Sequence, residues 1–245
     1  MSRYFIEVAY KGTHYSGFQV QQNAVTIQSE IENALTVCFK STFSLTGASR
    51  TDTGVHALQN YFHVDTTEVQ IDNPSRLYNL NSILPDDIVI KAIFKVADEA
   101  HCRFYAVSRG YKYHIYQQKN PFLKGRAYYF PFTVDKDLLD KAASVMMDFN
   151  DFTSFSKKNT QVNNFICQIH KSQWIEEKDQ LVYNVEANRF LRGMVKGIVG
   201  TMLMVGTKKI TLSQFEKIIS DRNCSKANFA VSPCGLYLVK VQYPN

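Results

Sequence analysis

The chain of 245 residues is 45% hydrophobic and 20% charged, which allows a sizeable core and excludes a largely disordered protein. A net charge of +6 suits a polyanionic partner such as nucleic acid but does not demand one. The five cysteines form no C-x-x-C pair, which argues against a disulfide framework or structural zinc site and favours buried thiols in a reducing compartment.

Hydrophobic periodicity predicts alternating strands and helices in the first half of the chain. The predicted elements are, in order, a strand over 3–10, an amphipathic helix over 26–40, a strand over 57–66, and a short helix followed by a strand within 75–96. In the second strand, Leu58, Phe62 and Val64 are expected to face one way. A polar loop over 47–57 leads into this strand.

The second half repeats the pattern loosely. The predicted elements are a strand from Ser108 that stops near Asn120 and Pro121, a helix over 135–149, a strand over 180–190, an apolar helix from Phe190, a helix from Thr211 and a closing strand over 234–244. The first of these helices should bury Leu138, Ala142, Val145 and Met146 on one side. Thr211 and Gln214 have the spacing of a capping box.

Because the strands alternate instead of being apolar throughout, an α+β fold is expected. It should have a mixed, mostly antiparallel sheet from two similar α/β halves, with helices covering one face. We assign residues 1–105 to the N-terminal half with the polar loop, and residues 106–245 to the C-terminal half that completes the shared sheet and cleft. The N-terminus has no secretory signature and the most apolar stretch is short and carries Arg192 and Lys196, so we expect a cytoplasmic protein without a membrane partner.

The loop GASRTDTGVHA, residues 47–57, places Arg50 and Asp52 two residues apart between glycines. An aspartate in such a loop is usually a turn former or a helix cap. An adjacent arginine also lowers the pKa of a carboxyl group and keeps it ionised. An ionised carboxylate held in a rigid loop is suited to act as a nucleophile or general base.

This loop resembles the GAGRTDAGVHA signature of tRNA pseudouridine synthases of the TruA type. Four further stretches resemble segments of the same family in the same order: HCRFYAVSRGYKYHIY (101–116), NDFTSF (150–155), ANRFLRGMVKGIVGTMLMVG (187–206) and GLYLVKVQYP (235–244). The resemblance therefore covers the chain from end to end and implies the pseudouridine synthase fold.

The resemblance implies an isomerase that converts uridine to pseudouridine in the anticodon stem-loop of tRNA, at family-like positions 38–40, without a cofactor. Asp52 takes the place of the catalytic carboxylate, and Arg50 that of the residue that enters the RNA stem to displace the target base. Tyr111 matches the stacking tyrosine, whereas Tyr113 and Tyr116 are interpreted as ordinary strand aromatics. A homodimer that binds tRNA is implied as well.

Lys196 takes the place of a family arginine that pairs with the catalytic aspartate. A lysine can form that ion pair but cannot offer two parallel hydrogen bonds. Ser49 replaces a family glycine beside Arg50, and Thr53 replaces an alanine. These departures motivate an alternative hypothesis, an RNA-binding protein of the same fold whose catalysis is lost or retargeted.

Other cations are candidate RNA contacts. Arg189, Arg192 and Lys196 are spaced to share one helix face, with a solvated face as the competing interpretation. Further candidate phosphate contacts, each also explicable as a surface charge, are Arg103, Lys157 and Lys158.

No metal site is expected. His56 and His63 follow the loop, but the sequence indicates no third and fourth ligand, so structural or RNA-facing roles are favoured for them. A metal-dependent nuclease is disfavoured because no carboxylate or histidine cluster supports it.

Overall fold

The computed structural model describes residues 2–67, 69–158 and 162–244. The chain forms two compact units: unit 1 combines the residues up to Val107 with those from Tyr237 onward, and unit 2 comprises Ser108–Leu236. Each unit contains a sheet and helices, and the predicted α+β class with a mostly antiparallel sheet is confirmed. None of the helices in the described part of the chain has both the length and the apolar content needed to span a bilayer.

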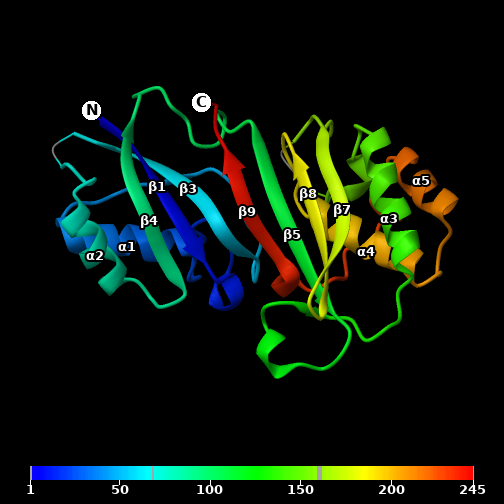
Figure 1. Cartoon of the computed structure of the whole chain (residues 1–245). Helices are drawn as coiled ribbons and strands as arrows, with labels where there is room; N and C mark the ends of the chain where they lie inside the picture. The colour runs from blue at the N-terminus through cyan, green and yellow to red at the C-terminus, as the bar shows by residue number, and fades with distance from the viewer. Residues whose placement is uncertain (1, 68, 159–161, 245) are drawn as a thin grey trace. The chain divides into compact units, whose positions relative to one another are not determined.

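Unit 1 has a sheet in the order β4-β1-β3-β9 (Figure 1). The short β2 pairs with β3. Its elements are β1 (Ser2–Tyr10), α1 (Ile27–Phe39), β2 (Thr46–Gly47), β3 (His56–Thr66), α2 (Pro74–Ile83), β4 (Ile88–Val96) and β9 (Leu236–Gln242). β1 runs antiparallel to β3 and β4, whereas β9 is parallel to β3. The predicted strands and helices of the first half are all present.

The α1 helix forms because its apolar residues recur on one face. Ile27, Ile31, Ala34 and Leu35 are buried. At its start the Thr26 side chain accepts from the main-chain N–H of Ser29, whose own side chain caps Thr26 in return. The helix therefore begins and packs as its sequence directs.

The strand prediction for β3 was wrong at Leu58. Phe62 and Val64 are buried, but Leu58 is 52% exposed. The pairing of β1 with β3 shifts between Val8 and Tyr10. Val8 pairs with Asn60 and Tyr10 with Ala57, so β3 has one more residue than β1 between the paired positions. This bulge reverses the alternation, so Leu58 faces outward although strict alternation places it with Phe62.

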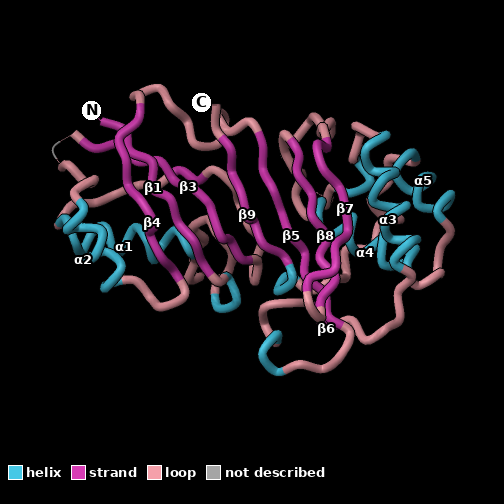
Figure 2. Tube along the Cα trace, viewed as in Figure 1, coloured by secondary structure: helices cyan, strands magenta, loops and turns pink. Residues whose placement is uncertain are grey.

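Unit 2 has a sheet in the order β5-β8-β7, with β6 beside β5. Its elements are β5 (Ser108–Tyr116), β6 (Tyr128–Tyr129), α3 (Lys136–Val145), β7 (Ile169–Glu177), β8 (Gln180–Ala187), α4 (Met194–Gly206) and α5 (Leu212–Ser220). Between β5 and α3 the chain is mostly loop, interrupted by a 3-10 turn and β6 (Figure 2). The three helices pack on one another, and α3 packs on β7, where Ser172 donates to the Ala143 carbonyl at 2.8 Å.

Two helix predictions in unit 2 need correction, and one is confirmed. Ala142 and Met146 are buried as predicted, but Leu139 and Ala143 are buried in place of Leu138 and Val145, because two adjacent leucines allowed either phase of the helical pattern. The apolar helix begins at Met194 instead of Phe190. The capping box of Thr211 and Gln214 is confirmed at the start of α5.

Candidate active site

The loop that carries Arg50 and Asp52 joins β2 to β3 in unit 1. It leaves β2 with the N–H of Ala48 bonded to the carbonyl of Tyr61 at 2.8 Å. It returns through a turn in which the N–H of Val55 donates to the Asp52 carbonyl at 3.1 Å. Gly54 sits in this turn at φ +76°, a conformation that favours glycine. The loop presents Arg50 as an exposed side chain and Asp52 as a half-buried one.

A buried polar network lies beneath the loop. The amide of Asn60 donates to the carbonyl of Ser49 at 2.8 Å and to the hydroxyl of Tyr10 at 3.2 Å. The Tyr10 hydroxyl lies 2.7 Å from Oγ1 of Thr51, and the N–H of Phe18 donates to the Thr51 carbonyl at 3.1 Å. The network therefore fixes Ser49 and Thr51, the two neighbours of Arg50, and Thr51 also directly precedes Asp52.

Sequence reasoning missed Tyr10 and Asn60 as parts of the site. Asn60 is fully buried and Tyr10 is 5% exposed. The available signal was an asparagine directly before the aromatic residues Tyr61 and Phe62 of a predicted strand, since buried amides need hydrogen-bond partners. That signal shows that a partner exists, but only the fold reveals which one.

His56 supports the loop from its C-terminal end. Its Nδ1 accepts from the main-chain N–H of Gly12 at 3.0 Å, and its ring lies 4.6 Å from that of Tyr237. A Cβ atom on Gly12 would come within 2.0 Å of the Val55 carbonyl oxygen, so glycine is required for this close approach. These contacts favour a structural role for His56, one of the two roles, structural or RNA-facing, that its sequence context favours.

Unit 2 contributes Tyr111, which lies on β5 opposite Val185 of β8. Its half-buried ring is 4.9 Å from that of Phe190 and nearly perpendicular to it. In contrast, Tyr113 is fully buried and its hydroxyl donates to the Ser232 carbonyl at 2.6 Å. Burial also raises the pKa of Tyr113 well above its usual range. Tyr111 is thus the more accessible of the two strand aromatics.

The three cations predicted on one helix face do not share a helix. Arg189 and Arg192 lie in the loop before α4, and only Lys196 is on the helix, half-buried in its first turn. The physical reason is Gly193, whose φ of +75° cannot continue a right-handed helix. The cations therefore lie along a loop and a helix start in unit 2.

The remaining candidate phosphate contacts divide between the units. Arg103 is exposed in unit 1, with its guanidinium 5.8 Å from the Phe104 ring centroid. Lys157 and Lys158 lie in unit 2, and the N–H of Lys157 donates to the carbonyl of Arg192 at 3.0 Å. Lys157 and the arginine loop are therefore neighbours, a proximity that the sequence did not reveal.

His63 has neighbours that the sequence did not indicate. His63, His101 and Cys102 each place a potential ligand atom within 4.8 Å of the others, so this cluster could hold a metal ion. The hydrogen bonds favour a structural role: Cys102 Sγ donates to the Thr46 carbonyl at 3.1 Å, and His101 Nδ1 accepts the N–H of Arg103.

Electrostatics also oppose a cation at this cluster. Burial, with smaller contributions from the Arg3 guanidinium and His101, lowers the pKa of His63 to about 4. Burial and Arg3 lower the pKa of His101 as well. The positive charge of Arg3 therefore disfavours a cation at this cluster. Asp65, which accepts two hydrogen bonds from Arg3 at 2.7 Å, partly compensates that charge.

The described geometry supplies two sets of functional groups. Unit 1 holds a half-buried carboxylate and an exposed guanidinium on an anchored loop. Unit 2 holds an aromatic pair and a group of cations. Carboxylates suit nucleophilic or acid–base chemistry, whereas aromatic rings and cations suit the bases and phosphates of nucleic acid.

Comparison with known proteins agrees with these features. A family model described as tRNA pseudouridine synthase matches residues 6–105 and 149–244. A tRNA pseudouridine synthase A from Parabacteroides distasonis is 41% identical, covering 100% of this chain and 97% of the relative. A protein of the same name from Azobacteroides pseudotrichonymphae is 38% identical, covering 100% of this chain and 98% of the relative. Another, from Staphylococcus aureus, is 35% identical, covering 98% of this chain and 90% of the relative. The chain therefore belongs to the tRNA pseudouridine synthase family.

Proposed function

We propose that this protein isomerises uridine to pseudouridine in the anticodon stem-loop of tRNA, with Asp52 as the catalytic carboxylate. The observation that carries the proposal is the match to tRNA pseudouridine synthases along almost the whole chain. The anchored loop supports the choice of Asp52, because its carboxylate is half-buried and its neighbours are held by buried hydrogen bonds.

The reaction rearranges one nucleotide. The N1–C1′ bond breaks, the uracil rotates, and a C5–C1′ bond forms; the proton lost from C5 is balanced by one gained at N1. No net oxidation or reduction occurs, so the reaction itself requires no redox cofactor. Asp52 acts next to the ribose and the base, either as a nucleophile or as a base.

The other site residues bind and position the RNA in this proposal. Arg50 enters the stem and helps to extrude the target nucleotide, which costs roughly a few kcal/mol. Tyr111 stacks on the extruded uracil, and Lys196 supplies a cation for Asp52. Arg103, Arg189 and Arg192 are proposed contacts to the RNA backbone. By resemblance to the family, we also propose a homodimer in the cytoplasm.

The test uses purified protein and tRNA transcripts that contain no modified nucleotides. We expect pseudouridine in the anticodon arm without added metal, detected by mapping after chemical derivatisation. A matched transcript with cytidines in place of the anticodon-arm uridines is the substrate control and should yield none. A folded preparation that forms no pseudouridine in the anticodon arm of any of a set of different tRNAs would contradict the proposal.

A second candidate is an RNA-binding protein with lost or retargeted catalysis. Two observations favour it: Lys196 stands where the family signature has arginine, and the buried hydroxyl of Ser49 has no hydrogen-bond partner within the described chain. This candidate predicts tRNA binding that weakens steeply with salt, without product. The same transcripts distinguish the two, because binding and product are measured separately.

A further inference from the structure

Unit 2 contains a polar hollow of about 280 Å³ outside the groups assigned to the reacting nucleotide. Its lining includes three cations, two hydroxyls and one aromatic ring: Lys157, Lys158, Arg222, Thr153, Ser156 and Phe165. We call it the basic pocket. Cations together with hydroxyl donors are the groups that bind phosphate oxygens in nucleic-acid complexes.

One carboxylate pairs with a cation of the basic pocket. Asp151 pairs through one oxygen with Nε of Arg222 at 2.9 Å. Its other oxygen accepts the N–H and the hydroxyl of Thr153 at 3.0 and 2.6 Å. Among the described residues of unit 2, neither Lys157 nor Lys158 has a carboxylate within 4.0 Å. The ammonium groups therefore keep a positive potential for an anion.

The basic pocket adjoins the loop that contacts Tyr111. The Tyr111 ring packs on Phe190, and two residues further on the Arg192 carbonyl accepts the N–H of Lys157. Two residues of chain span at most about 7 Å. The Lys157 side chain also follows this loop, since a Cβ atom on Gly193 would lie 3.0 Å from its Cγ. Neighbouring nucleotides of one strand can therefore reach both places.

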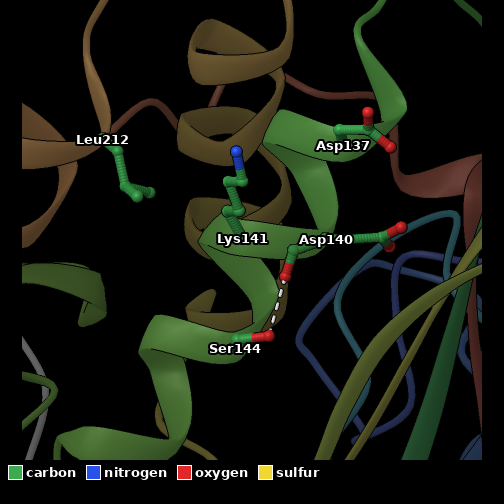
Figure 3. Close-up of a pocket in the computed structure, with 5 residues that line it drawn as sticks. All are labelled: Asp137, Asp140, Lys141, Ser144 and Leu212. Carbon is green, nitrogen blue, oxygen red and sulfur yellow. Dashed lines mark hydrogen bonds between the residues drawn. The ribbon is translucent and has the colours of Figure 1, made fainter.

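A second hollow in unit 2 has the opposite character. It lies at α3, where Figure 3 shows Asp137 and Asp140 with Lys141, Ser144 and Leu212. Its two carboxylates repel phosphate, although Lys136 pairs with Asp140 at 2.6 Å. The contrast shows that a positively charged lining is not common to both hollows of unit 2. Lys141, in the acidic hollow, supplies a matched control lysine.

We propose that the basic pocket binds a backbone phosphate of the RNA substrate, a few nucleotides from the uridine that is isomerised. This inference rests on the proposed function, because it requires RNA as the ligand. Lys158 supplies the charge from an exposed position, the exposed Arg222 lines the same pocket while its Nε pairs with Asp151, and Lys157 connects the pocket to the arginine loop. Such a contact fixes the register of the RNA without reading its sequence.

The experiment measures the affinity for unmodified tRNA over a salt series for the wild type, Lys158→Gln, Lys158→Gln/Arg222→Gln and the control Lys141→Gln. Each phosphate contact contributes about 0.9 to the slope of log K against log salt. From that slope, Lys158→Gln should lose roughly fivefold in affinity at about 0.15 M salt and the double variant more. Steady-state kinetics should place most of the loss in KM.

The single variant keeps the test independent of folding, because Lys158 is exposed and Asp151 keeps Arg222 as its partner. Slopes and affinities of both pocket variants equal to those of Lys141→Gln would overturn the proposal. Binding of inorganic phosphate by the wild type but not the variants, with unchanged tRNA affinity, would also overturn it in favour of a free anion. A wild type that makes no pseudouridine contradicts the proposed function instead, which separates the two failures.

Discussion

Removing the Asn60 amide should detach the Arg50–Asp52 loop from its support. Asn60 makes three hydrogen bonds: its amide donates to the Ser49 carbonyl and to Tyr10, and its oxygen accepts the N–H of Tyr61 at 2.9 Å. In Asn60→Ala all three are lost. The loop would then keep the bonds of Thr51 to Phe18 and Tyr10 but lose its direct anchor at Ser49.

The magnitude follows from burial. Asn60 is fully buried, so its former partners cannot easily turn to water. A buried group left without a partner costs about 1–3 kcal/mol, and an ordinary hydrogen bond contributes about 0.5–1.5 kcal/mol. We therefore expect the free energy of unfolding to fall by about 2–4 kcal/mol. Tyr10→Phe, which removes one hydroxyl from the same network, should cost about 1–2 kcal/mol.

The effect on catalysis is the more specific part of the prediction. A displacement of about 1 Å at a catalytic group can cost about 10²-fold in rate. We expect kcat of Asn60→Ala to fall by roughly that factor, with a smaller change in KM, because binding groups elsewhere are untouched. Urea unfolding gives the stability, and single-turnover formation of pseudouridine gives the rate.

Asn81→Ala is the matched control. The Asn81 side chain bonds the N–H and the carbonyl of Ile90 at 2.8 and 2.9 Å, between α2 and β4 and outside the loop. This variant should lose stability but keep kcat. If Asn60→Ala and Asn81→Ala lose stability alike and both keep kcat within about twofold, the network does not position the loop and the reasoning is refuted.

Three further predictions concern stability, pH and RNA binding. Ser49→Ala should raise the free energy of unfolding by up to about 1 kcal/mol, seen as a higher urea midpoint at constant slope, because the buried hydroxyl has no hydrogen-bond partner in the described residues; a lower midpoint would contradict this. Burial lowers the pKa of His63 in the folded protein to about 4, below its usual value of about 6.5, so its contribution to stability is fully present above pH 6.5 and is lost as the pH falls towards 4. The free energy of unfolding should decline by up to about 3 kcal/mol over this window, and the decline should be smaller in His63→Gln. The same pH dependence in His63→Gln as in the wild type would refute the claim that His63 causes the decline. Tyr111→Ala should weaken tRNA binding by roughly five- to hundredfold through lost stacking of about 1–3 kcal/mol, whereas Tyr111→Phe should bind nearly normally; equal affinities of the two variants would exclude stacking.

The sequence predicted what local periodicity and chemistry control. The helices and most of the strands follow from their helical or alternating spacing, and the capping box of Thr211 and Gln214 follows from residue types at a fixed offset, whereas β7 and the short β2 and β6 were not predicted. Asp52 and Arg50 were chosen as candidates because a charged pair in a glycine-bracketed loop is unusual and because the loop resembles the family signature.

Features that depend on distant partners were not predictable. Leu58 points outward because of a bulge set by the pairing of β1 with β3, and the late start of α4 depends on the backbone angle of Gly193. The support of the loop joins Tyr10 and Asn60, which are 50 residues apart. Long-range pairing of this kind leaves no periodic signal in the sequence.

The central claim is that the carboxylate of Asp52 performs the chemistry. Asp52→Asn keeps the size and shape of the side chain but replaces one carboxylate oxygen with an NH2 group, which removes the negative charge and the nucleophilic and basic character of the carboxylate. We predict that this variant binds tRNA with an affinity within about threefold of the wild type and forms no pseudouridine in a single-turnover reaction. Formation of pseudouridine by Asp52→Asn at a rate near that of the wild type would contradict the account.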